Sequence, residues 1–277
     1  MRPPRPPARF PLPLNRVPGA ARPLTPSSNE VLRPQRPLQH AAQDAQQQAS
    51  GRAAPSGLGM DSAAVRERMV QRLRGDGIRC EPVLQALSRV ERHRFVDSAL
   101  ANQAYEDTSL PIGLQQTISK PSVVARMLAL LFEGDRARTQ GHLGRVLEIG
   151  TGCGYQAALL SLVGRGVVSI ERLKALHDRA RENLAGLRDG DLRLVYGDGR
   201  LGHAPRAPYD SIVAAAGGED VPPAWLDQLA VGGRLVAPMH DAARGGQVLL
   251  VLDRQAEGIV RSWHDAVHFV PLKSGVA

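Results

Sequence analysis

The chain contains 277 residues, of which 43% are hydrophobic and 22% are charged, and its formal net charge is +8. This composition supplies enough apolar material for one sizeable core and is not that of a collagen or a disulfide-rich scaffold. Two cysteines, without a C-x-x-C motif or paired His/Cys spacing, exclude a disulfide framework and give no sign of a metal site. The longest apolar stretches are far shorter than the ~20 residues that cross a bilayer. We therefore expect a soluble protein of the reducing cytoplasm.

Residues 1–59 differ in composition from the rest of the chain. They hold 12 of the 21 prolines, eight arginines and no lysine, with Glu30 and Asp44 as their acids. Such a segment cannot bury enough apolar surface to order itself, so we predict a disordered Pro/Arg-rich extension. The prolines also interrupt any signal or transit peptide, and Phe10 is the single aromatic residue that could stack on nucleic acid. Met60, just before a helical pattern, is a candidate for the physiological start.

The first regular pattern after this extension is helical. Apolar residues at helical spacing predict a helix with Asp61 or Ser62 as its N-cap and with Gly75 and Gly77 as its stop. Further helices are predicted at Glu81–Val90 and Ser122–Phe132. Residues 60–140 are therefore expected to form a helical preface to the remainder of the chain.

From residue 141 onward, short β-branched runs alternate with helical patterns. Helices are predicted at Tyr155–Val163 and Leu173–Leu187. This alternation indicates an α/β fold with a doubly wound, mostly parallel sheet covered on both faces. We expect residues 141–277 to form the α/β domain and residues 60–277 to form one compact unit. The predicted strands are Val146–Ile149, Val167–Ile170, Leu192–Tyr196, Ser211–Ala214, Leu235–Ala237, Val248–Leu252 and Val267–Val270.

A glycine-rich segment, Glu148–Tyr155, follows the first of these strands and opens a helix. Glu171 ends the next strand, 23 residues after Glu148. Strand, glycine turn, helix, strand and acid form a nucleotide-binding arrangement, in which the acid accepts the ribose hydroxyls. A dinucleotide fingerprint would place its third glycine at position 155, whereas this chain has Gly154. A carboxylate at Glu148 would repel a pyrophosphate and attract the cationic end of S-adenosylmethionine. The pattern therefore favours S-adenosylmethionine over a dinucleotide, and a loop without a ligand would not explain both acids.

Two further residues each have both a functional and a structural interpretation. Asp198 lies in a Gly-Asp-Gly turn after the third strand, where an acid can bind an adenine amino group or serve only the turn. Ser119 stands two residues before a proline at a helix start, which is typical of an N-cap, and a helix N-terminus can also bind a carboxylate. Arg92, His93 and Arg94 predict a solvated basic helix end.

Several segments together resemble the protein-L-isoaspartate O-methyltransferase family. The similarity extends from about residue 61 to residue 273. Its most specific parts are the Thr-Ile-Ser segment and the terminal Phe-Val-Pro-Leu, since the glycine loop is common to many methyltransferases. The segments that carry it are Arg94–Asp97, Leu110–Gly113, Gln116–Ser119, Val146–Gln156, Gly197–Gly199 and Phe269–Leu272.

The resemblance implies a Rossmann-like methyltransferase and assigns roles to single residues. Ser119 would be the active-site serine, and Phe269, Val270, Pro271 and Leu272 would border the peptide substrate. The chain departs from the family at Gln115, where glycine is usual, and in Ala214–Gly218. The residues implied to line the S-adenosylmethionine pocket are Thr117, Ile118, Glu148, Gly150, Gly152, Glu171, Asp198 and Gly199.

The activity implied by the resemblance is methylation of the free α-carboxylate of L-isoaspartyl residues in damaged proteins, which initiates repair through a succinimide. That carboxylate is already ionised at pH 7, and the sulfonium carries its own leaving group, so neither a general base nor a metal is required. We expect isoaspartyl peptides and proteins as partners, no nucleic acid or membrane, and a monomer.

Two alternatives remain at this point. One is a methyltransferase for nucleic acid or for a small carboxylate, although Tyr209–Ala215 lacks the Asp/Asn-Pro-Pro-aromatic segment of base amino methylation. The other is a non-catalytic module that binds S-adenosylmethionine.

Overall fold

The computed structural model describes residues 63–186 and 191–277. The expected N-terminal extension and the candidate start at Met60 lie outside the described residues. Within those residues, no helix is long and apolar enough to cross a membrane.

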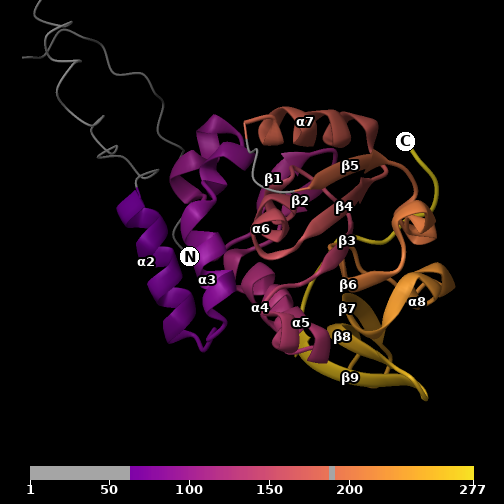
Figure 1. Ribbon diagram of the computed structural model, residues 1–277. Helices are drawn as coiled ribbons and strands as arrows, with labels where there is room; N and C mark the ends of the chain where they lie inside the picture. The colour runs from indigo at the N-terminus through magenta and orange to yellow at the C-terminus, as the bar shows by residue number, and fades with distance from the viewer. Residues whose placement is uncertain (1–62, 187–190) are drawn as a thin grey trace, which may run out of the picture. The chain divides into compact units, whose positions relative to one another are not determined.

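A seven-stranded sheet organises the molecule, in the order β5-β4-β3-β6-β7-β8-β9 (Figure 1). The first five strands in this order are parallel, and β8 and β9 add antiparallel hairpins to one edge. The strand order reverses between β3 and β6, which is the place where open α/β sheets bind ligands. The predicted doubly wound, mostly parallel fold is confirmed. The strands are β3 (Arg145–Ile149), β4 (Gly166–Glu171), β5 (Leu192–Tyr196), β6 (Tyr209–Ala214), β7 (Leu229–Asp241), β8 (Gly246–Gln255) and β9 (Gly258–Ala266).

Helices cover the sheet because side chains alternate between its two faces. In β3, Val146 belongs to the core beneath one helical layer, while Leu147 and Ile149 belong to the core on the other side, which includes Trp225. In Figure 1 the preface helices α2 and α3 lie beside α4 and α6. The helices are α2 (Ala63–Gly75), α3 (Glu81–Arg89), α4 (Pro121–Phe132), α5 (Asp135–Gln140), α6 (Tyr155–Val163), α7 (Lys174–Leu184) and α8 (Pro223–Gln228).

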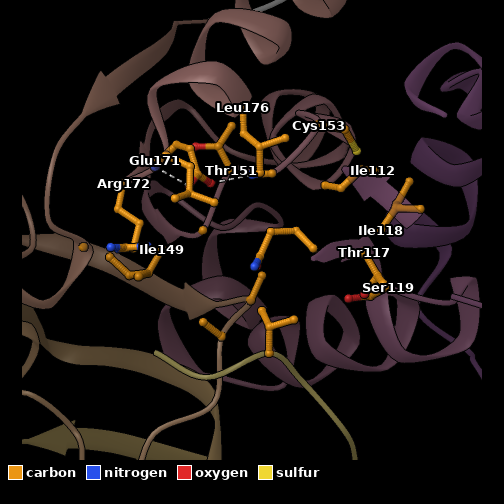
Figure 2. A pocket seen from close by; sticks show the side chains of 18 of the residues that line it. Ile112, Thr117, Ile118, Ser119, Ile149, Thr151, Cys153, Glu171, Arg172 and Leu176 are labelled. Carbon is orange, nitrogen blue, oxygen red and sulfur yellow. Dashed lines mark hydrogen bonds between the residues drawn. The ribbon is translucent and has the colours of Figure 1, made fainter. Parts of the chain in front are cut away.

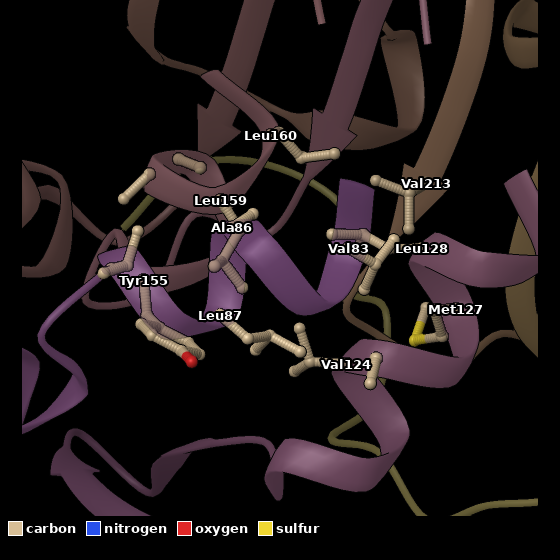
Figure 3. Packing of buried hydrophobic residues seen from close by; sticks show 14 of the residues in the cluster. Val83, Ala86, Leu87, Val124, Met127, Leu128, Tyr155, Leu159, Leu160 and Val213 are labelled. Atoms are coloured by element: carbon tan, nitrogen blue, oxygen red, sulfur yellow. The ribbon is translucent and has the colours of Figure 1, made fainter. Parts of the chain in front are cut away.

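The preface and the α/β part share one apolar core. Figure 3 shows Leu87 of α3, Leu128 of α4 and Leu159 of α6 packed together beside Val213 of the sheet. All four side chains are fully buried. Burial of a Leu or Val side chain stabilises the folded state by about 1.5–3 kcal/mol. The preface is therefore held to the sheet through α4 and α6.

The fold differs from the sequence prediction at its last strand, at a hairpin before α4 and at α5, which was not predicted. The predicted strand Val267–Val270 is wrong, because the last strand, β9, ends at Ala266. The residues of β9 are almost all exposed, so the sequence has no buried apolar run that would predict this strand. The hairpin of β1 (Leu110–Gly113) and β2 (Gln116–Ile118) was also missed, since its turn lacks the usual turn residues. The short 3₁₀ elements are η1 (Arg92–Phe95), η2 (Ser98–Gln103), η3 (Gly199–Leu201) and η4 (Ala204–Arg206).

Candidate active site

A cavity of about 400 Å³ lies at the carboxyl ends of the parallel strands. Figure 2 shows Glu171 and Arg172 on one side of the open space and Thr117 and Ser119 on the other. Residues that follow β3, β5 and β6 form its floor, and the β1–β2 hairpin forms the opposite wall. The residues that the sequence analysis placed here and that do line the cavity are Thr117, Ile118, Ser119, Gly150, Gly152, Glu171, Gly199, Val270, Pro271 and Leu272.

The glycine loop joins β3 to α6 through left-handed backbone conformations. Gly150, Gly152 and Gly154 have φ values of 91°, 56° and 94°, which residues other than glycine rarely adopt. Glu171 holds this loop, because its Oε2 accepts a hydrogen bond from the Gly152 N–H at 2.9 Å and its Oε1 accepts one from the Leu173 N–H at 2.9 Å. The buried carboxylate is thus fixed at the cavity edge with lone pairs left for a ligand.

The expectation that Glu148 lines the pocket is corrected by the structure. Its side chain is fully buried on the face of β3 that α6 covers, and it is absent from the cavity wall. Its Oε2 accepts a hydrogen bond from Ser169, and Thr151 in the glycine loop bonds to Ser169 in turn. Burial raises the pKa of Glu148 to about 8. At neutral pH the group is largely a neutral acid, so it cannot attract a cation by charge.

Asp198 also lies outside the cavity wall, although its neighbour Gly199 is part of it. Its Oδ1 accepts from the Arg200 N–H at 2.9 Å and caps η3, and its Oδ2 accepts from the Gly275 N–H at 2.6 Å. The structure shows the turn role, and an adenine contact by Asp198 stays a prediction. Asp198 additionally anchors the segment after Leu272 beside the cofactor end of the cavity.

Ser119 is not the N-cap that the sequence pattern indicates. Lys120 occupies the N-cap position of α4, and Asp107 caps the helix from a distant loop by accepting from the N–H and the hydroxyl of Ser122, each at 2.8 Å. The Ser119 hydroxyl has no hydrogen-bond partner among the described residues, and it points into the open space in Figure 2. It is therefore free to bind a ligand.

The C-terminal segment forms another wall of the cavity. Val270, Pro271 and Leu272 line it, whereas Phe269 is buried behind it, which corrects the expectation that all four border the site. Gly217 holds this segment, since its N–H donates to the Val270 carbonyl at 2.8 Å and its carbonyl accepts from the Leu272 N–H at 2.7 Å. A Cβ at Gly217 would collide with the Gln247 side chain. Gly217, within the Ala214–Gly218 run, thus has a packing role.

The other departure from the family lies in the turn between β1 and β2. Leu114 and Gln115 have φ values of 51° and 58°, which favour glycine, and both line the cavity. Glycine would adopt this turn without strain. The hairpin therefore brings a strained turn to the mouth of the site.

Sequence reasoning missed a buried cation next to the glycine loop. Arg92 is fully buried, so the predicted solvated helix end is wrong for this residue. Its guanidinium lies 4.9 Å from the ring centroid of Tyr155, the first residue of α6, and its Nε donates to the Ala104 carbonyl at 2.7 Å. A cation over an aromatic ring is attracted to it. Arg92 therefore links the preface to the start of α6.

Cys153, Gln156, Arg172 and Lys273 also line the cavity and were not assigned to it from sequence. Cys153 was interpreted as a small filler, and burial raises the pKa of its thiol, which disfavours the reactive thiolate. The position of Arg172 directly after Glu171 is the signal that would have found it. In the described part of the chain, no group of three or more His, Cys, Asp or Glu side chains is placed to hold a metal ion.

The comparisons with known proteins agree on one family. Residues 64–277 match the sequence model of the family Protein-L-isoaspartate(D-aspartate) O-methyltransferase. The chain belongs to this family. It is 62% identical over 273 residues to the protein-L-isoaspartate O-methyltransferase of Methylibium petroleiphilum, covering 98% of this chain and 97% of that one. It is 60% identical to the protein of the same name from Leptothrix cholodnii, covering 97% and 95%.

Solved structures support the same assignment. A protein-L-isoaspartate O-methyltransferase with 27% identity superposes with a TM-score of 0.67, covering 76% of this chain and 67% of the other. A family member from Plasmodium falciparum, solved in complex with S-adenosyl-L-homocysteine, has 22% identity and a TM-score of 0.63, covering 75% and 98%. The second likeness concerns the fold. Together these findings make the chain a methyltransferase of this family.

The residues present fit S-adenosylmethionine, the cofactor of this family. The cavity volume lies within the ~300–1,000 Å³ typical of small-ligand sites. Its walls combine apolar side chains such as Ile170 and Leu176 with one fixed carboxylate at Glu171. Gln156 also lines the cavity, and its side chain contacts the buried Glu148 carboxyl behind the wall. An adenosyl group between apolar walls, with polar ends at Glu171 and Gln156, suits this set of groups.

Proposed function

We propose that this protein methylates the free α-carboxylate of L-isoaspartyl residues in damaged proteins and peptides. Family membership supports the reaction, and the single observation that carries it here is the Ser119 hydroxyl. That hydroxyl lies at the cavity wall opposite Glu171 and is bound to none of the described residues. It offers one donor to a carboxylate oxygen at the place where a substrate would meet the cofactor.

The residues named here would divide the work between binding and alignment. Glu171 would accept hydrogen bonds from the ribose, and Gly150 and Gly152 would let the loop approach the cofactor closely. When bound, S-adenosylmethionine supplies an electrophilic methyl group on a sulfonium. Ser119 would donate to one oxygen of the substrate carboxylate and orient the other. The new O–C bond forms as the C–S bond breaks and sulfur keeps the electron pair, so no proton is transferred.

The product fits a repair function. The backbone amide nitrogen of the next residue can attack the ester carbonyl, and the C–OCH3 bond breaks so that methanol leaves and a succinimide forms, whereas a carboxylate has no comparable leaving group. Hydrolysis of the succinimide regenerates some normal aspartate. The protein therefore needs to supply only the methylation step, and we propose that it does so as a monomer, without a metal, in the cytoplasm.

The test is transfer of labelled methyl from S-adenosylmethionine to an isoaspartyl peptide and to its aspartyl twin. Wild type should place base-labile label on the isoaspartyl peptide alone. Ser119→Ala should lower kcat/KM about tenfold to a hundredfold with unchanged cofactor affinity, since a hydrogen bond to a charged group is lost. Ser88→Ala, in α3 and away from the cavity, is the matched control.

The same experiment separates the alternatives. Cofactor binding without label on either peptide would overturn the proposed function and point to a nucleic acid or a small carboxylate as substrate. Full activity of Ser119→Ala would remove the role of the serine while leaving the reaction in place. Activity in the presence of a chelator tests the metal-free proposal, and sedimentation of the active species tests the monomer. Cell fractionation tests the location.

A further inference from the structure

A second groove, of about 400 Å³, meets the cofactor cavity at Ser119. Ser119 lines both spaces. The groove is bounded by the start of α4, by the loop before β1 and by the chain that leaves β9. Its lining residues are Ser109, Ser119, Lys120, Val123, Ala266, Val267 and His268.

The wall of the groove continues into the wall of the cavity. Residues 266–268 line the groove, and Val270, two residues after His268, begins the part that lines the cavity. Gln247 fixes this stretch, because its carbonyl accepts from the Val267 N–H at 2.9 Å and its side chain accepts from the Phe269 N–H at 2.7 Å. A peptide whose reactive carboxylate reaches Ser119 would therefore have its flanking residues in the groove.

The groove lining offers one ammonium group, that of Lys120, and the imidazole of His268. Lys120 and His268 are its titratable residues, both are exposed, and neither side chain forms a hydrogen bond or ion pair with a described residue. The carboxylate oxygens of the neighbouring acids already have partners, although Asp107 is bound by neutral groups and keeps its negative charge. Asp265 pairs with Arg126 at 2.7 Å, and both oxygens of Asp107 accept from Ser122. The free donors next to Ser119 therefore favour an anionic ligand.

We propose that Lys120 and His268 form a specificity site that favours isoaspartyl substrates with acidic side chains next to the damaged residue. The inference rests on the proposed function and adds a preference among its substrates. Lys120 directly follows Ser119 in the chain, so its ammonium reaches a residue adjacent to the one being methylated. His268 contributes a ring N–H donor from the opposite wall.

The experiment compares three isoaspartyl peptides that differ only in one flanking residue, which is Glu, Gln or Lys. Wild type should show a kcat/KM about threefold to tenfold higher for the Glu than for the Lys peptide, as expected for exposed ion pairs, with the difference shrinking at high salt. Lys120→Gln and His268→Gln should each reduce this ratio. Lys120→Glu should invert it.

Arg261→Gln is the matched control, because it removes a positive charge from an exposed position of β9 that lines neither space. It should keep the wild-type ratio. Equal kcat/KM for the Glu and Lys peptides in wild type, or an unchanged ratio in Lys120→Glu, would overturn the specificity site and leave the proposed function standing. Failure to methylate all three peptides would overturn both.

Discussion

Ser169 donates a hydrogen bond to Glu148 across the neighbouring parallel strands β4 and β3, and both side chains are completely buried. The two residues are register partners and share the face that α6 covers. Thr151 extends the chain of hydrogen bonds to the wall of the cofactor cavity. Glu148, the first residue of the glycine motif, thus stabilises the loop through buried hydrogen bonds.

This burial predicts a specific pH dependence. The pKa of Glu148 is raised from 4.5 to about 8, so the unfolded chain releases this proton at a lower pH than the folded protein. The free energy of unfolding should therefore fall between about pH 4.5 and pH 8, by up to about 1.4 kcal/mol per pH unit. Glu148→Gln should lack this component in urea unfolding measured across that range. Glu257→Gln, in an exposed turn, should keep it. Equal slopes for wild type and Glu148→Gln would show that the carboxyl is not held neutral.

Gly154 should be intolerant of a side chain. Its φ is 94°, and a Cβ there would come within 2.9 Å of Leu184 Cδ1 in α7. Gly154→Ala should lose about 2–3 kcal/mol of stability from backbone strain and the forced shift, and should bind the cofactor more weakly. Gly141 has a φ of 72°, but a Cβ there would meet no other atom within 4 Å. Gly141→Ala should therefore lose only about 1 kcal/mol of stability, from backbone strain. Thermal unfolding and cofactor titration of both variants test this. Similar stability losses in the two would remove the steric argument.

Trp225 should affect cofactor binding, although it does not line the cavity itself. It is fully buried in α8, and its Nε1–H donates to the Gly199 carbonyl at 2.8 Å. Gly199 lines the cavity. Trp225→Phe removes one of the two hydrogen bonds of that carbonyl, which also accepts from the Gly202 N–H at 3.1 Å, and should cost about 0.5–1.5 kcal/mol, together with a higher KM for the cofactor. Trp263→Phe, on exposed β9, should change neither quantity. An unaltered KM in Trp225→Phe would limit the residue to packing.

Asp198 should control the order of the C-terminal segment. Its two carboxylate oxygens accept from Arg200 and Gly275. Asparagine has a single side-chain acceptor oxygen, so Asp198→Asn must leave one of these N–H groups without its bond. We expect faster amide hydrogen exchange in residues 272–277 of this variant, measured by mass spectrometry. Asp227→Asn, exposed in α8, serves as the control. Wild-type exchange in Asp198→Asn would mean that other contacts hold the segment.

The sequence by itself determined the architecture and the centre of the site. Alternating strand and helix periods predict the parallel sheet, because period and chain order are local properties of the sequence. The glycine loop and Glu171 follow from the same logic, since they lie within one contiguous strand-loop-helix-strand unit. The hairpin of β1 and β2 was not predicted, because Leu114 and Gln115 adopt a turn conformation that their side chains disfavour.

Only the tertiary structure decided the environment of each side chain. Strand register places Glu148 opposite Ser169 beneath α6, which turns an expected cation-binding carboxylate into a buried neutral acid. Asp107 caps α4 from a distant loop and so leaves Ser119 free. Such outcomes depend on contacts between residues far apart in the chain, and no local period encodes them. Packing therefore determines which polar groups remain available for a ligand.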